Sequence, residues 1–163
     1  AAVPTSGLAA LHALRDVAKV QAGQSVLIVG ASGGVGTFAV QIAKTLGAEV
    51  TGVCSTPNVD LVRSLGADHV VDYTLEDFAE SGRRYDIIFD NIENRSLSDC
   101  RRALAPTGTL ILNSGTGAQG VSFLVRLLKP LLISPFLRQA DAIRHIETGH
   151  AKGKTIIRVG DGG

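Results

Sequence analysis

The chain of 163 residues is 45% hydrophobic and 19% charged, with a formal net charge of +1. This length is typical of one globular domain with a sizeable apolar core. A nearly neutral chain without a Lys/Arg run gives no electrostatic support for binding nucleic acid or a membrane surface. The two cysteines, Cys54 and Cys100, lack CxxC spacing and lie in apolar or helical surroundings. They indicate reduced core thiols and a cytoplasmic location.

Short apolar strands alternate with helical segments along the chain. Ser6 is a candidate cap for a first helix through Val20, with Leu8, Leu11, Leu14 and Val17 on one face. Strands are predicted at residues 25–29, 49–54, 69–72, 86–90 and 109–113. Helices are predicted at residues 35–46, 58–65, 74–81 and 96–104. The most apolar stretch, residues 121–137, is interrupted by two charged residues and two prolines, which argues against a membrane helix.

A glycine-rich turn, Gly30-Ala31-Ser32-Gly33-Gly34-Val35-Gly36, joins the first predicted strand to the next helix. Glycines allow a ligand to approach the backbone closely, and a helix start offers unpaired N–H groups and a partial positive charge. This combination suits a pyrophosphate. The alternative is that a tight strand-to-helix turn alone selects these glycines.

The alternation of strands and helices predicts an α/β fold, a doubly wound parallel sheet of the Rossmann type with helices on both faces. Right-handed crossovers place the carboxyl ends of all its strands at one edge. That edge collects the glycine turn and the segments that follow the other strands, namely residues 54–58, Tyr73, Asp90-Asn91 and Asn113-Ser114. Ligands of such sheets bind there, so the sequence predicts a dinucleotide site.

Seven segments, taken together, resemble the cofactor-binding half of the medium-chain dehydrogenase/reductase superfamily, in its zinc-independent quinone oxidoreductase branch. They are Gly7–Leu14, Gly23–Ile28, Gly30–Gly36, Cys54–Asn58, Leu65–Asp68, Asp72-Tyr73 and Gly149–Lys154. The resemblance implies transfer of a hydride from NAD(P)H to a quinone, enone or related carbonyl substrate, without zinc. The four histidines accordingly show no Cys or carboxylate cluster at zinc-ligand spacing.

The end of the second strand favours NADPH over NADH. NAD sites usually carry a carboxylate there to hold the ribose 2′-hydroxyl, but this chain has Ser55 and Thr56, whose hydroxyls could bond a 2′-phosphate. Relatives that use NADPH have Lys or Arg near positions 57 and 58, where this chain has Pro57 and Asn58. The resemblance also brings Tyr73 to the phosphate. Ordinary turn chemistry is the alternative explanation of the hydroxyls.

The remaining candidate residues follow the fourth and fifth strands. The resemblance places Asn91, Asn113 and Ser114 on the nicotinamide side. Side chains that close their own turns are the alternative. The predicted binding set is therefore Ala31, Ser32, Gly33, Gly34, Val35, Gly36, Ser55, Thr56, Asn58, Tyr73, Asn91, Asn113 and Ser114, and no catalytic residue is assigned.

Two parts of the family pattern have no counterpart in this sequence. Residues 1–163 are predicted to form a single dinucleotide-binding domain, with a first helix (1–22), a Rossmann core (24–137) and a C-terminal helix and return strand (140–163). The resemblance implies an N-terminal catalytic domain, which is not expected within these residues. Gln139 runs directly into Ala140 where relatives have a helix and the sixth strand of the sheet, so the sheet is expected to lack that strand.

These gaps leave two functional hypotheses. In the first, the chain is the NADPH-binding domain of a quinone-type oxidoreductase and is not catalytically competent alone. In the second, it is a non-catalytic nucleotide-binding or structural module. The expected partner is a small-molecule quinone or enone, neither nucleic acid nor a membrane is expected, and a homodimer remains an open question because the sixth strand commonly mediates it.

Overall fold

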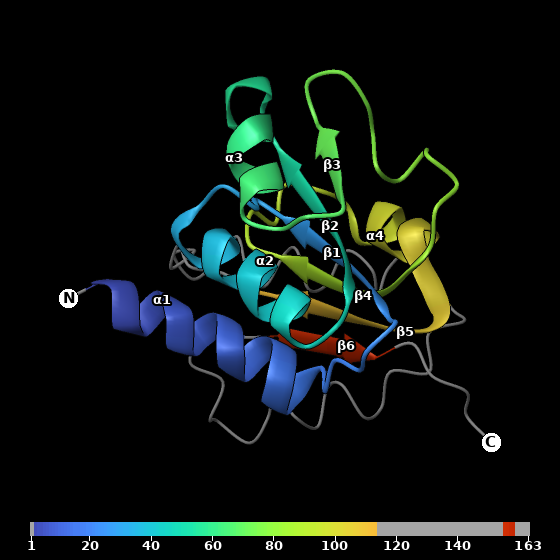
Figure 1. The fold of residues 1–163 in the computed structure, drawn as a ribbon. Coiled ribbons are helices and arrows are strands. Elements are labelled where there is room, and N and C mark those ends of the chain that lie inside the picture. Colours follow the sequence, from blue (N-terminus) through green and yellow to red (C-terminus); the bar gives the residue numbers. More distant parts are fainter. Residues whose placement is uncertain (1, 114–154, 159–163) are drawn as a thin grey trace, which may run out of the picture.

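A computed structural model describes residues 2–113 and 155–158 (Figure 1). Six strands form one sheet in the order β3-β2-β1-β4-β5-β6. The strands are β1 (Ser25–Val29), β2 (Glu49–Cys54), β3 (His69–Asp72), β4 (Tyr85–Asp90), β5 (Leu104–Leu112) and β6 (Thr155–Arg158). The helical segments are α1 (Ala2–Leu11), η1 (His12–Val17), α2 (Gly34–Thr45), η2 (Thr56–Asn58), α3 (Val59–Ser64) and α4 (Leu97–Ala103).

Strands β1 to β5 are parallel, as the sequence predicts. The chain runs outward from β1 to β3, then crosses back to β4 beside β1. This order is that of a Rossmann sheet, whose ligand site lies where the direction of winding reverses, between β1 and β4. The fold class expected from the sequence is therefore confirmed.

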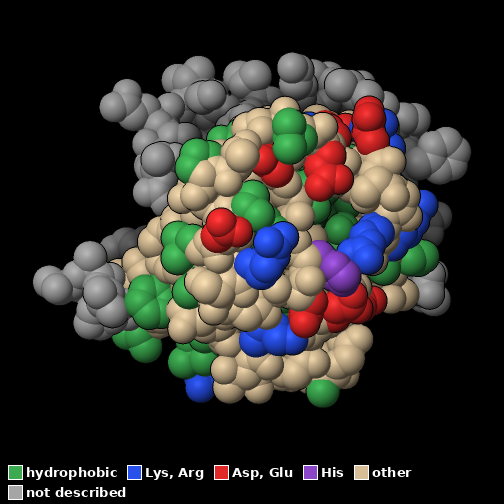
Figure 2. Space-filling view, turned by 45° about the horizontal axis from the view of Figure 1, so that its top comes forward, with side chains coloured by type: hydrophobic (Ala, Val, Ile, Leu, Met, Phe, Trp, Pro, Cys, Tyr) green, Lys and Arg blue, Asp and Glu red, His purple; other side chains and the backbone are tan. Residues whose placement is uncertain are grey.

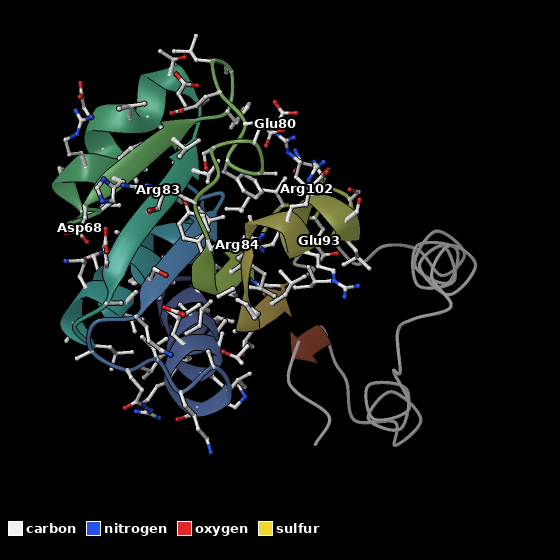
Figure 3. All side chains as sticks on the ribbon, turned by 90° about the vertical axis from the view of Figure 1, so that its right-hand side faces the viewer. Asp68, Glu80, Arg83, Arg84, Glu93 and Arg102 are labelled. Carbon is white, nitrogen blue, oxygen red and sulfur yellow. The ribbon has the colours of Figure 1, made fainter. Side chains whose placement is uncertain are left out.

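Apolar cores cover both faces of the sheet. Alternate strand residues such as Val26 and Ile28 pack with α1, η1, α2 and α3 on one face. Their neighbours Leu27 and Val29 pack with α4 and the segment before β4 on the other face. Figure 1 shows α1 to α3 on one side of the sheet and α4 on the other, and Figure 3 shows their side chains between the layers. Burial on both faces explains the continuous apolar runs of the central strands.

The first helix differs from its prediction. It starts before Ser6 as α1 and ends at Val17 as η1. η1 is a π-helix, which is wider than an α-helix, and the N–H of Ala18 donates to the carbonyl of Ala13 at 2.9 Å. Leu8, on the predicted apolar face, is 65% exposed. Leu14, on the same predicted face, is fully buried, and so are the small residues Ala10 and Ala13. A three-residue spacing drifts around a helix of 3.6 residues per turn, so it does not mark one face.

The helix predicted at residues 74–81 is replaced by turns. Asp72 Oδ1 accepts hydrogen bonds from the backbone N–H and the hydroxyl of Thr74, at 2.9 and 2.7 Å. Asp77 Oδ1 accepts one from the N–H of Ala79 at 2.9 Å. Such local bonds compete with helical ones. The segment still buries Phe78, which is 2% exposed, in the core beside α4.

The outer edge of β5 is paired by the predicted return strand, which is not the sixth strand that relatives have at the junction of Gln139 and Ala140. Strand β6 lies antiparallel to β5, with Leu110 opposite Ile157. The return strand therefore fills the sixth position within this chain and covers the edge that the sequence analysis left open.

Several expectations lie outside the described residues. They concern Ser114, the apolar stretch 121–137 and the C-terminal helix after residue 140. Within the described part, no helix is long and apolar enough to cross a membrane. Figure 2 shows acidic and basic side chains interspersed over one face of the molecule, without a large patch of either sign.

Candidate functional site

The glycine turn is a closed loop anchored to β2. The N–H groups of Gly30 and Ala31 both donate to the carbonyl of Val53, at 3.1 and 2.9 Å, and the N–H of Gly33 donates to the Gly30 carbonyl at 3.0 Å. Gly30 has φ +74°, in the left-handed region that favours glycine. The turn is thus fixed by backbone bonds at the carboxyl ends of β1 and β2.

Gly36 brings α2 against this turn. A Cβ added at Gly36 would lie 2.0 Å from the Gly30 carbonyl oxygen and 2.8 Å from the Ala31 Cα. Only glycine permits this close packing of helix on strand, which is the role of the third glycine in dinucleotide-binding turns. The structure therefore explains Gly36 by packing.

The first turn of α2 stays open towards the edge of the sheet. Gly33 is the N-cap of this 12-residue helix and provides no side-chain cap. A Cβ on Gly34 would meet only Ser6 Oγ, at 3.8 Å. The backbone N–H groups of a helix start and its dipole form an anion-binding position.

A cleft of about 290 Å³ lies beside this turn, at the carboxyl edge of β1, β2 and β4. Four of the predicted residues line it: Ser32, Gly33, Ser55 and Tyr73. The other lining residues are Val29, Gly30, Val53, Cys54, Phe78, Ile92, Asn94 and Arg95. Ala31, Gly34, Val35, Gly36, Thr56, Asn58, Asn91 and Asn113 are not among them. The structure therefore brings the glycine turn and the end of β2 together around one space.

The hydroxyls after β2 differ in their surroundings. Ser55 lines the cleft, and its Oγ accepts a hydrogen bond from Asn58 Nδ2 at 3.0 Å. Thr56 Oγ1 is 3.0 Å from the Thr74 hydroxyl, which donates to Asp72. The Thr56 and Thr74 hydroxyls hold the pKa of Asp72 below its usual range. Ser55 thus faces the cleft, while Thr56 belongs to a network around a buried carboxylate.

The asparagines after β4 and β5 bond one another. Asn113 Nδ2 donates to Asn91 Oδ1 at 3.0 Å, and Asn91 Nδ2 donates to the Val29 carbonyl at 3.1 Å. Buried Asp90 accepts from the N–H groups of Ile92 and Glu93, both at 2.9 Å. The two amide hydrogen bonds run between strand ends rather than within one turn, and they tie the ends of β1, β4 and β5 together.

Sequence analysis missed the cleft wall contributed by the segments before and after β4. Arg95 pairs with Asp77, and its guanidinium lies 5.5 Å from the centre of the Phe78 ring. Ile92 is 54% exposed at the same cleft. An arginine in the short segment between β4, which ends at Asp90, and α4 was the available signal, but an irregular segment gives no periodicity from which its direction could be predicted.

The thiols show no sign of nucleophilic use. Cys54 lines the cleft but is only 2% exposed, and burial together with nearby Asp72 raises its pKa. Burial raises the pKa of Cys100 to about 12, helped by Asp90 and Asp99. Both are free and buried, as the sequence predicts. A protonated, buried thiol is a poor nucleophile.

The fold is of the Rossmann type, and this edge is where sheets of that type bind their ligands. Residues 34–143 match the family described as zinc-binding dehydrogenase. The chain belongs to this family, within the medium-chain dehydrogenase/reductase superfamily and its quinone oxidoreductase-like branch, and the resemblance stated above is confirmed. The family description mentions zinc, whereas the described residues contain no group of three or more His, Cys, Asp or Glu side chains that could hold a metal.

Named relatives agree with this placement. The chain is 32% identical to an NADPH-dependent alkenal/one oxidoreductase of Arabidopsis thaliana, over 83% of this chain and 41% of that protein. It is 44% identical to the mitochondrial NAD(P)H oxidoreductase RTN4IP1 of Homo sapiens, over 98% of this chain and 55% of that protein. Among solved structures, a quinone oxidoreductase of Pseudomonas syringae superposes with a TM-score of 0.61 and 32% identity, covering 66% of this chain and 35% of that one. The chain thus spans about half or less of these relatives.

Proposed function

We propose that this chain is the NADPH-binding domain of an oxidoreductase that reduces a quinone, enone or related carbonyl compound. The observation that carries the proposal is the cleft between the glycine turn and Ser55. The helix start of α2 supplies backbone donors for a pyrophosphate, and Gly33 leaves that approach free of side chains. When bound, the nicotinamide would supply the hydride.

The end of β2 supports NADPH rather than NADH. Ser55 stands at the cleft where a carboxylate would select the ribose 2′-hydroxyl. Asp72, at the end of the neighbouring strand β3, is 7% exposed and accepts two hydrogen bonds from Thr74. We propose that Ser55 and Tyr73 contact the 2′-phosphate.

We further propose that Arg95 provides the cation missing at positions 57 and 58. It lines the same cleft as Ser55 and Tyr73. Its hydrogen bond to Asp77 uses one nitrogen, Nη1, and a guanidinium has five N–H donors. Donors therefore remain for a phosphate, which arginine binds well in bidentate geometry.

The substrate pocket is proposed to lie mainly on a second domain, because the relatives are about twice as long as this chain or longer. The human match also extends over 217 positions, more than the 163 residues of this chain, so that relative has internal residues that this chain lacks. We propose that they fall at the junction of Gln139 and Ala140.

The buried free cysteines support a reducing compartment such as the cytoplasm.

Titration of the 163-residue chain with NADPH and NADH, followed by nucleotide fluorescence, tests the binding proposal. We expect saturable binding, with NADPH the tighter ligand. Ser55→Asp should weaken NADPH binding at least about tenfold, because a carboxylate repels the 2′-phosphate and favours the 2′-hydroxyl of NADH. Ser64→Asp, which adds the same charge at an exposed position on α3, is the control. Absence of binding by either nucleotide would refute the proposal.

Turnover separates the oxidoreductase from the alternative, a nucleotide-binding module without catalysis. The observation behind the alternative is the short span of this chain within its relatives. NADPH oxidation is followed with a panel of quinones and enones, for this chain and for the chain extended by its upstream coding sequence. Turnover by the extended form alone supports the proposal, whereas binding without turnover in both forms supports the module.

A further inference from the structure

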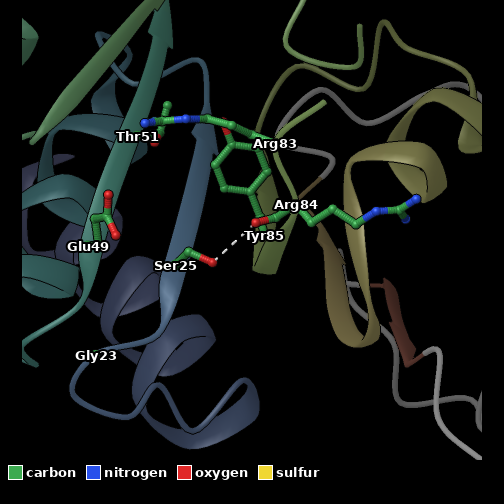
Figure 4. A pocket seen from close by; sticks show the side chains of 7 residues that line it. All are labelled: Gly23, Ser25, Glu49, Thr51, Arg83, Arg84 and Tyr85. Carbon is green, nitrogen blue, oxygen red and sulfur yellow. Dashed lines mark hydrogen bonds between the residues drawn. The ribbon is translucent and has the colours of Figure 1, made fainter. Parts of the chain in front are cut away.

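A second cleft lies at the opposite edge of the sheet, at the amino ends of its strands (Figure 4). Ser25, Glu49 and Tyr85 are the first residues of β1, β2 and β4. The cleft measures about 370 Å³ and is lined by Gly23, Ser25, Glu49, Thr51, Arg83, Arg84 and Tyr85. Because parallel strands separate it from the glycine turn, its occupant is independent of the proposed cofactor. Its size is at the lower end of small-molecule sites.

The hydroxyl of Tyr85 is a buried polar group that lacks a partner among the described residues. Tyr85 is 2% exposed, and its ring packs with Leu27, Ile88 and Leu104 in the core beside α4. Its Oη makes no hydrogen bond there. Buried polar groups are nearly always paired, so an unpaired hydroxyl at the wall of a cleft calls for a partner within the cleft.

Arg83 is an uncompensated cation at the same cleft. Its side chain extends across the mouth towards Thr51, past the Tyr85 hydroxyl, whereas the side chain of Arg84 points away (Figure 4). Within residues 2–113 and 155–158, Arg83 has no ion pair and no side-chain hydrogen bond. Arg84 Nη1 instead donates to the Leu104 carbonyl at 3.2 Å.

The acidic groups nearby already have donors of their own. Glu49 Oε1 is 2.8 Å from His69 Nε2. Asp86 Oδ2 accepts from the backbone N–H and the hydroxyl of Ser25, at 2.9 and 3.0 Å. These bonds hold Glu49 and Asp86 to His69 and Ser25, so that among the described residues Arg83 remains a cation without a bonded partner, next to an unpaired hydroxyl donor.

We propose that this cleft binds a small organic oxyanion, a carboxylate or phosphate group. The guanidinium of Arg83 pairs with the oxyanion, and the Tyr85 hydroxyl donates a hydrogen bond to it. Thr51, which is 2% exposed on β2, lines the inner wall. A guanidinium and a phenol hydroxyl both donate hydrogen bonds, so together they bind a carboxylate or a phosphate better than a neutral ligand.

Calorimetric titration of the full chain with inorganic phosphate and with succinate, at constant ionic strength, tests the site. Arg83→Gln should weaken binding at least about tenfold, because it removes a charge-assisted pair. Arg101→Gln changes the net charge equally at an exposed position on α4 that does not line the cleft, so binding should stay within about twofold. The tighter of the two probes identifies the phosphate or the carboxylate class.

Tyr85→Phe distinguishes a ligand site from a cavity of no consequence. Without ligand, its melting temperature should equal or exceed that of the wild type, because an unpaired buried hydroxyl is removed. Oxyanion binding should weaken several-fold, while NADPH binding stays unchanged. The proposal is overturned if neither probe saturates at millimolar concentration, if the two arginine variants bind equally, or if Tyr85→Phe binds as the wild type does.

Discussion

Replacing Gly36 by alanine tests whether the glycine turn depends on contact between α2 and the backbone of the turn. The new Cβ would lie 2.0 Å from the Gly30 carbonyl oxygen, where real Cβ atoms keep 3.0 Å or more. This oxygen accepts a bond from Gly33, and the N–H of Gly30 is bonded to Val53. Relief by about 1 Å therefore breaks turn hydrogen bonds, because no flexible side chain is available to move.

The expected magnitude follows from three terms. Overpacking costs about 1–3 kcal/mol, a lost hydrogen bond about 1 kcal/mol, and the better helix propensity of alanine returns about 1 kcal/mol. Since the clash is with backbone, we expect a net loss of about 2–3 kcal/mol, or about 4–12 °C in melting temperature for a domain of this size.

Thermal and urea unfolding followed by circular dichroism measure this loss. Gly34→Ala is the matched control, because it lies in the same helix and its Cβ meets only Ser6 Oγ at 3.8 Å. The control should be unchanged or up to about 1 kcal/mol more stable. Equal stability of Gly36→Ala and wild type, within about 0.5 kcal/mol, would refute the packing explanation of this glycine.

Three further predictions concern other contacts. Ser96→Ala removes the N-cap hydrogen bond that Ser96 Oγ accepts from the N–H of Asp99 at 3.2 Å. The free energy of unfolding in urea should fall by about 1 kcal/mol, whereas the control variant Ser64→Ala, at an exposed position, should show no comparable loss. The pKa of Asp68 is held below its usual range by the Val50 N–H and by Lys44. This stabilisation is present above the pKa of Asp68 in the unfolded state and is lost as the pH falls through its pKa in the folded state. The difference in unfolding free energy between wild type and Asp68→Asn should therefore be steady above about pH 4 and should close below it. A difference that persists in acid contradicts this assignment. Arg95→Gln should weaken NADPH binding about tenfold relative to exposed Arg101→Gln, and equal affinities would remove Arg95 from the proposed phosphate site.

The strands around the site could be predicted closely from the sequence. The predicted bounds of β1, β2 and β3 match the structure, and those of β4 differ by one residue. These strands are buried on one or both faces, so their apolar runs end where the sheet ends. The position of the glycine turn followed from the same logic, because a parallel sheet places all strand ends at one edge.

Segments held by side-chain bonds could not be predicted in this way. Asp72 and Asp77 close turns where a helix was expected. The pairing of β6 with β5 joins residues far apart in the chain, and no local pattern encodes it. The two cases have different causes: the turn bonds are local but depend on single side chains that hydrophobic periodicity does not report, whereas the partner of β6 lies outside the window in which periodicity is measured.

The position of a residue relative to a strand end determined which site residues were found. Ser55 and Gly33 follow strands directly, so strand ends located them. Phe78 and Arg95 reach the cleft from irregular segments, and their contact with each other and with Asp77 sets their direction. The proposed preference for NADPH now depends on Ser55 from one wall and Arg95 from the other. A cofactor preference inferred only from the end of β2 therefore omits half of the wall that would contact the phosphate.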